Sequence, residues 1–165
     1  MTSSPLKHSF APVWTEHTRL LVLGSLPGEV SLARQRYYAH PQNQFWRLIG
    51  SVVGADLVAL DYEARLQALL DAGIGLWDVV GSGTRKGSLD TDLRLHHPND
   101  LAALADALPQ LQAIGFNGGT AARLGRRLLS ARADLALLDL PSSSPAYTLA
   151  FERKLESWIG LRDYL

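Results

Sequence analysis

Four short apolar runs, each followed at once by a segment rich in Gly, Ser or Pro, constrain the fold of this chain more than any other feature. The runs are residues 19–23, 74–80, 111–116 and 135–140, and the segments after them have the sequences GSLPG, GSGTRKGS, NGGT and PSSSPA. Apolar residues at helical spacing occupy most of the chain between them. Continuous apolar strands that alternate with helices are typical of a parallel sheet that is covered on both faces.

The predicted fold is therefore α/β, a three-layer α-β-α sandwich around a short, mostly parallel four-stranded sheet. Helices are expected over residues 43–53, 62–70, 100–108, 117–128 and 147–159, and Asn99 is the expected N-cap of the third. Residues 1–17 are polar and irregular, and we expect them to form an N-terminal arm on a single domain of 165 residues.

The composition excludes several classes of protein. The chain contains 0 Cys, which rules out disulfides, thiolate zinc sites, cysteine nucleophiles and Cys-ligated iron–sulfur clusters. His96 and His97 have no carboxylate at ligand spacing, so no metal or other cofactor is expected. No apolar segment has the length of a signal sequence or of a membrane span, so we expect a cytoplasmic protein with no membrane partner. We also expect it to be a monomer.

The four Gly-, Ser- and Pro-rich segments are expected to line the opening of one binding site, here called the mouth, because the carboxyl ends of parallel strands lie at the same edge of a sheet. Backbone N–H groups and serine hydroxyls at such junctions bind phosphate, and several of them together suit a phosphodiester backbone. Tyr37, Tyr38, His40 and Asn43 add aromatic faces and an amide, which a flipped base requires. Simpler interpretations stay open: GSLPG can be a plain turn, and Asn43 and the PSSSPA serines can cap helices.

Charge is distributed unevenly along the chain. Lys and Arg number 16, as do Asp and Glu, and the net charge of +0 argues against a protein that coats nucleic acid. Acids gather in residues 56–71 and 90–106. The mouth segments carry Arg34, Arg36, Arg47, Arg85 and Lys86 against Glu29 and Asp78, and the helix after NGGT carries Arg123, Arg126, Arg127 and Arg132 without an acid. A neutral total with a basic face predicts DNA binding that involves few phosphate contacts.

The order of these motifs resembles that of the uracil-DNA glycosylase superfamily over residues 21–158. Within it, the chain is similar to the cluster-free hypoxanthine-DNA (deoxyinosine) glycosylases, which are related to the mismatch-specific uracil/thymine glycosylases. The sequence YYAHPQNQFW at residues 37–46 resembles that branch's YYxHPxNxFW signature. GSLPG occupies the place of the first motif, GIGLWDVV at 73–80 resembles the base-recognition strand, and LPSSSPA at 140–146 resembles the second motif, which grips DNA.

This resemblance implies a monofunctional DNA glycosylase that flips a deaminated base, hypoxanthine first, and excises it by hydrolysis in base excision repair. The implied substrate is double-stranded DNA, with single-stranded DNA as an alternative. Asn43 is the implied catalytic residue that orients water. The expected base contacts are Gly24, Ser25, Leu26, Tyr38, Trp77, Asp78 and Asn117. The expected DNA contacts are Pro27, Gly28, His40, Arg85, Lys86, Ser142, Ser143, Ser144 and Pro145.

The chain also departs from the superfamily's pattern. Ser25, Leu26 and Pro27 stand where relatives carry a water-activating Asp or Asn, the second motif has no His, and Tyr147 replaces an Asn. Asp78, at a strand end, can also serve only to cap a loop. Two alternative functions remain open: a uracil or mismatch-specific glycosylase, and a non-catalytic nucleotide-binding α/β protein.

Overall fold

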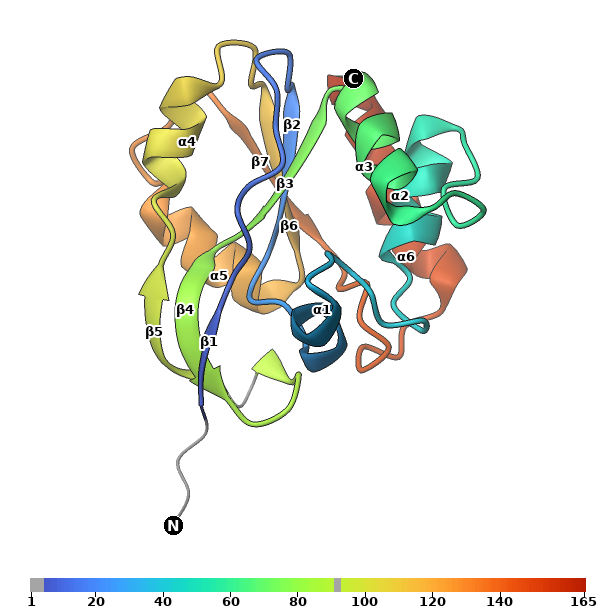
Figure 1. Cartoon of the computed structure of the whole chain (residues 1–165). Helices are drawn as coiled ribbons and strands as arrows, with labels where there is room; N and C mark the ends of the chain where they lie inside the picture. The colour runs from blue at the N-terminus through green and yellow to red at the C-terminus, as the bar shows by residue number, and fades with distance from the viewer. Residues whose placement is uncertain (1–4, 91–92) are drawn as a thin grey trace.

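A parallel four-stranded sheet forms the centre of the computed structural model, which describes residues 5–90 and 93–165 (Figure 1). The strand order is β3-β2-β6-β7, with bounds β2 Leu20–Gly24, β3 Ile74–Asp78, β6 Ala113–Asn117 and β7 Ala136–Leu140. All five residues of β2 are buried, because this strand lies between β3 and β6 with helices on both sides. The parallel sheet predicted from the apolar runs is confirmed.

Helices cover both faces of the sheet, which confirms the three-layer arrangement (Figure 1). One face carries α2 (Phe45–Val53), α3 (Tyr62–Asp71), α6 (Phe151–Trp158) and a 3₁₀ helix (Ile159–Tyr164), and the other carries α4 (Leu101–Ala107) and α5 (Gly119–Leu128). Side chains alternate along each strand, so Leu20 and Val22 of β2 face the first layer and Leu21 and Leu23 face the second.

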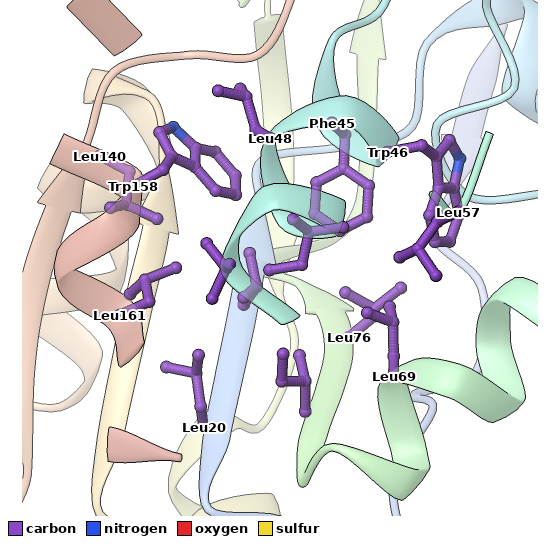
Figure 2. Close-up of a cluster of buried hydrophobic side chains, with 14 of the residues drawn as sticks. Leu20, Phe45, Trp46, Leu48, Leu57, Leu69, Leu76, Leu140, Trp158 and Leu161 are labelled. Carbon is purple, nitrogen blue, oxygen red and sulfur yellow. The ribbon is translucent and has the colours of Figure 1, made fainter. Parts of the chain in front are cut away.

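The core beneath α2, α3 and α6 is rich in aromatic residues (Figure 2). The ring centroid of Phe45 lies 4.9 Å from that of Trp46 and 5.9 Å from that of Trp158, both in edge-on geometry. Full burial of such a side chain contributes about 1.5–3 kcal/mol. These contacts fix the first turn of α2 against the sheet, which matters because the residues before that turn belong to the candidate site.

The sequence pattern does not predict a second, antiparallel sheet, which has the order β1-β4-β5. Its strands are β1 (Leu6–His8), β4 (Val80–Arg85) and β5 (Leu93–Pro98). The predicted GSGTRKGS loop is therefore wrong over residues 81–85. Glycine at position 81 serves close packing instead of a turn, since an added Cβ would lie 2.7 Å from Oδ1 of Asn99.

Apart from shifts of one or two residues at helix ends, the helices differ from the predictions at three places. Residues 29–34 form a short helix, α1 (Glu29–Arg34), that the sequence does not indicate. The N-cap of α4 is Asp100, whose carboxylate accepts the Ala103 N–H at 3.0 Å, whereas the Asn99 side chain donates to the Asp78 carbonyl at 2.7 Å. The last helix begins at Phe151, because residues 141–150 fold as a loop.

The N-terminal segment packs along the edge of the central sheet. Of the predicted arm, residues 1–4 lie outside the described part of the chain, residues 6–8 form β1, and Val13 pairs with Leu76 of β3. Among the helices formed by the described residues, none has the length and apolarity that crossing a bilayer requires.

Candidate functional site

The last residues of three neighbouring strands lie on one face of the central sheet. Gly24 ends β2, Asp78 ends β3 and Asn117 ends β6, and Gly24 pairs in register with Asp78. The alternation of side chains along each strand places all three on the face covered by α2, α3 and α6. Gly24, Asp78 and Asn117, all predicted base contacts, are thus brought together at the carboxyl edge of the sheet.

Tyr38 covers this group of strand ends. Its ring stacks on Phe45 with a centroid distance of 3.9 Å and an interplanar angle of 19°. Its hydroxyl accepts a hydrogen bond from Nδ2 of Asn117 at 3.3 Å, and its carbonyl accepts one from Nε1 of Trp46 at 3.2 Å. Tyr38 has a φ of 53°, in the left-handed region that a tyrosine rarely adopts. Such a conformation persists only where surrounding contacts hold it, so the ring position is firmly set.

Asp78 is the buried acid of the site. Its side chain is 4% exposed, and its Oδ2 atom has no hydrogen-bond partner among the described residues. The pKa of Asp78 is raised to about 7, mainly by burial and also by the nearby carboxylate of Asp90, while the guanidinium of Arg85 opposes the shift. The site therefore offers a carboxyl group that is neutral in weakly acidic solution and has a free oxygen.

Gly24 allows this carboxyl group and the Tyr38 hydroxyl to lie close against the end of β2. A Cβ added at Gly24 would lie 2.7 Å from Oδ1 of Asp78 and 3.2 Å from the Tyr38 hydroxyl oxygen. A side chain at position 24 would therefore occupy the same space as these two polar groups.

Asn117 joins the strand ends to the loop at residues 141–146. Its Oδ1 accepts the Ser143 N–H at 2.9 Å, and its Nδ2 donates to Oγ of Ser143 at 2.8 Å and to the Tyr38 hydroxyl. The Ser143 carbonyl in turn accepts the N–H of Gln44 at 3.0 Å. Both N–H bonds of the Asn117 amide are thus used within the protein, so this residue connects Tyr38 to the loop.

The two outer serines of that loop are arranged differently from Ser143. Oγ of Ser142 accepts the N–H of Ser144 at 3.1 Å, and Oγ of Ser144 accepts the N–H of Ala146 at 3.2 Å. Each hydroxyl uses a lone pair in these bonds, which leaves its hydrogen to donate to a ligand. Pro145 beside them is exposed.

Arg85 supports the GSLPG loop from beneath. Its side chain is 1% exposed, and its guanidinium donates to the carbonyls of Leu26 at 3.2 Å and Pro27 at 2.5 Å and to Asp90 at 2.9 Å. Ser25 donates to the same Asp90 oxygen at 2.7 Å. Burial and these bonds take Arg85 and the Ser25 hydroxyl out of reach of a ligand, which differs from the contacts predicted for them.

The backbone N–H of Gly28 faces away from Arg85. The peptide bond between them is trans, so its N–H points opposite to the Pro27 carbonyl and away from Arg85. Gly28 therefore presents a backbone donor on the outer side of the loop. Lys86, which follows β4, is exposed.

Asn43 lines a groove of about 710 Å³ together with Tyr38 and His40. Its Oδ1 accepts the N–H of Phe45 at 2.9 Å, although the N-cap residue of α2 is Gln44 and not Asn43, and its Nδ2 has no partner among the described residues. His40 is exposed, and its Nδ1 accepts the N–H of Gln42 at 3.1 Å.

Trp77 lies apart from the other predicted base contacts. Its ring packs against the core beneath α4 and α5, on the face opposite to Asp78, and its Nε1 donates to the Phe10 carbonyl at 2.9 Å. Alternation along β3 explains this placement, because neighbouring residues of a strand point to opposite faces.

The sequence interpretation does not assign a role to Asp90 or Lys154. Asp90 pairs with Arg85, and no sequence pattern marks it. Lys154 is buried, and its Nζ donates to the Ser144 carbonyl at 3.3 Å. A signal for Lys154 does exist, since it stands three residues after Phe151 and four before Trp158, on the apolar side of α6.

Within residues 5–90 and 93–165, no group of three or more His, Asp or Glu side chains is arranged to hold a metal ion. The site consists of one buried carboxyl group, an aromatic ring, amides and hydroxyls. Such groups can bind a planar ring by stacking and edge hydrogen bonds, and can bind phosphate through neutral donors.

Comparisons with known proteins agree with this arrangement. The family model of the Uracil DNA glycosylase superfamily matches residues 12–161 of this chain. A hypoxanthine DNA glycosylase of Methanosarcina barkeri is 47% identical over 112 residues, which are 68% of this chain and 71% of that protein. A hypoxanthine DNA glycosylase of Methanosarcina acetivorans is 37% identical over 153 residues, 93% of this chain and 96% of that protein.

A solved structure is similar over nearly the whole chain. It is the solution NMR structure of a candidate uracil DNA glycosylase from Methanosarcina acetivorans, with a TM-score of 0.87 and 37% identity, covering 97% of this chain and 99% of that one. The resemblance indicated by the sequence motifs is thereby confirmed. The chain belongs to the uracil DNA glycosylase superfamily.

Proposed function

We propose that this protein is a monofunctional DNA glycosylase of the cytoplasm that excises hypoxanthine from DNA in base excision repair. The names of the two Methanosarcina relatives support hypoxanthine as the base. The observation that carries the proposal is the buried carboxyl group of Asp78, which has an oxygen without a partner and packs closely against Gly24 at the end of β2.

Hypoxanthine matches a neutral carboxyl group along one edge. Its N1–H is a donor, and the neighbouring O6 is an acceptor. A neutral Asp78 accepts the N1–H with its carbonyl oxygen and donates its O–H to O6, which forms two hydrogen bonds in one plane. An ionised Asp78 lacks the second donor and places a negative charge beside O6.

The same contact assists cleavage of the glycosidic bond. When the C1′–N9 bond breaks, the bonding electrons pass to the base and raise the negative charge on O6. A hydrogen bond from the Asp78 O–H is stronger to this charged oxygen than to the neutral one, so it stabilises the transition state. Because the pKa of Asp78 is about 7, the carboxyl group holds its proton over the weakly acidic range.

Tyr38 and Asn43 complete the proposed reaction site. One face of the Tyr38 ring rests on Phe45, and we assign the other face to stacking on the flipped base. Asn43 holds a water molecule that adds its oxygen to C1′ and passes a proton to the released base. An amide is a weak base, so the contribution of Asn43 is orientation.

Binding of the DNA backbone is assigned to hydrogen-bond donors around this site. Ser142 and Ser144 supply hydroxyl hydrogens and Gly28 supplies a backbone N–H. His40, Lys86 and Pro145 are exposed and stay in the proposed DNA surface, for double-stranded DNA first and single-stranded DNA second. Arg85, Ser143 and Trp77 are reassigned to support of the loops and the core.

Uracil is the second candidate base, because the solved relative is named as a candidate uracil DNA glycosylase. The N3–H and O4 of uracil also pair with a neutral carboxyl group. Excision should therefore be measured on oligonucleotides that carry hypoxanthine, uracil or xanthine opposite each normal base, with abasic sites detected by alkaline cleavage. We expect hypoxanthine to be released fastest. Release of none of these bases, together with tight binding of free nucleotides, would support the non-catalytic alternative and overturn the proposal.

A further inference from the structure

Lys154 is a buried lysine for which the proposed reaction has no use. Its side chain is 1% exposed, on the side of α6 that faces the core. Lysine side chains normally extend to bring the ammonium group into water, even when the aliphatic part is covered. Burial of the whole side chain therefore needs an explanation.

The ammonium group has few partners inside the protein. It donates to the Ser144 carbonyl at 3.3 Å and lies 5.4 Å from the ring centroid of Tyr147. No carboxylate of the described residues forms an ion pair with it. Burial lowers the pKa of Lys154 below the ordinary value for a lysine, as expected for a cation without a counter-charge. A methionine of similar shape would avoid this desolvation cost.

The loop that contacts Lys154 carries hydroxyl donors of the kind that bind an anionic ligand. Ser144 binds Lys154 through its carbonyl, and its Oγ, like that of Ser142, accepts a backbone N–H and keeps its own hydrogen. The same residue thus contacts the buried cation on one side and carries a hydroxyl donor for a ligand. An anion on these hydroxyls would supply the counter-charge that Lys154 lacks.

We propose that Lys154 is the cation of a phosphate-binding site whose direct contacts are the hydroxyls of Ser142 and Ser144, and that its ligand is one backbone phosphate of the DNA. Lys154 acts from beneath the loop, as a positioning and charge-supplying residue. This inference rests on the proposed function and adds to it, because the serines alone carry no charge to oppose that of the phosphate. It also explains why a costly buried cation is present in the free protein.

The test compares Lys154→Met, which removes the charge, with Lys154→Arg, which keeps it. The probe is a duplex that carries a stable abasic-site analogue, and its Kd is measured over a range of salt concentrations. For Lys154→Met we expect Kd to rise about tenfold and the slope of log Kd against log salt to fall by about one. The KM for an inosine duplex should rise similarly, with the single-turnover rate at saturation within about twofold of the parent.

Two further measurements separate this role from a structural one. The melting temperature of Lys154→Met should equal or exceed that of the parent, because an unpaired buried charge is removed. Arg153→Met removes an exposed charge at the neighbouring position of α6 and is the matched control. Its salt slope should stay close to that of the parent, and that of Lys154→Arg should do so too.

A parent protein that excises hypoxanthine, together with identical salt slopes for Lys154→Met and Lys154→Arg, would overturn this inference alone. A lower melting temperature of Lys154→Met with unchanged Kd would also overturn it, and would make Lys154 structural. A parent protein that neither binds DNA nor excises a base overturns the proposed function, and this inference with it.

Discussion

Oδ1 of Asp78 lies 2.7 Å from the position that a Cβ of Gly24 would occupy, so the absence of a side chain at position 24 is what lets the carboxyl group of Asp78 lie against the end of β2. Both residues end neighbouring strands and pair in register, which makes this contact a property of the sheet itself.

Gly24→Ala should abolish excision without abolishing DNA binding. The added methyl group would collide with Asp78 and lie 3.2 Å from the Tyr38 hydroxyl oxygen, so it would displace the two side chains that are assigned to the base. We expect a loss of about 100-fold or more in single-turnover rate. Gly119→Ala is the control, because a Cβ there meets no atom within 4 Å. A Gly24→Ala protein as active as Gly119→Ala would place the base elsewhere.

Asn43→Ser separates catalysis from the start of α2. A serine at position 43 can still accept the N–H of Phe45, a contact that Asn43 makes at 2.9 Å, but it cannot reach as far to hold water. The melting temperature should stay near that of the parent, and the excision rate should fall by about 100-fold. Asn43→Ala should lose the same activity and about 1 kcal/mol of stability. Full activity of Asn43→Ser would show that Asn43 only supports the helix.

Arg85→Met should affect stability more than DNA binding. The guanidinium is buried and bonded to two loop carbonyls and to Asp90, so its loss leaves several polar groups unpaired. We expect the free energy of unfolding to fall by about 3 kcal/mol, with no change in the salt slope of DNA binding. Chemical unfolding and the binding assay described for Lys154 measure the two effects. A reduced salt slope with normal stability would make Arg85 a DNA contact after all.

Asp78 should make the protein less stable as the pH rises. The pKa of Asp78 is raised to about 7 in the folded protein, above its ordinary value of 3.8, so the folded state binds more protons between these two pKa values. Stability due to this group is complete below about pH 4 and is lost as the pH rises through 7. Asp78→Asn removes this loss. The variant should be more stable than the parent at pH 8 by several kcal/mol, on the order of the shift itself, and much closer to it at pH 4. Equal stability differences at both pH values would contradict the raised pKa.

The central sheet and its helices could be predicted because burial on two faces and helical spacing leave a clear pattern in the sequence. β2 is the clearest case, with five buried apolar residues that end at Gly24. The second sheet could not be predicted, because β4 has the sequence VGSGTR, in which glycines that permit close packing resemble a loop. The sequence pattern also could not predict that the Arg85 side chain is buried. Its burial depends on hydrogen bonds to carbonyls that lie 58 and 59 positions earlier in the chain.

The candidate site, too, could be predicted only in part. The strand ends indicated that Gly24, Asp78 and Asn117 would meet, since parallel strands end at one edge. The pattern could not show that Asn117 uses its amide on Ser143 and Tyr38, or that the ring of Trp77 turns to the other face. These depend on tertiary contacts between segments far apart in the chain.

The account depends most on a neutral Asp78 that pairs with the edge of hypoxanthine, and the pH dependence of single-turnover excision from an inosine duplex tests it most directly. The parent rate should decline above about pH 7, as the carboxyl group ionises and loses its donor. Asp78→Asn keeps one donor and one acceptor without a titrating proton, so it should remain active and show no such decline. Asp78→Leu should be inactive throughout. Parallel pH profiles for the parent and Asp78→Asn, or an active Asp78→Leu, would contradict the account.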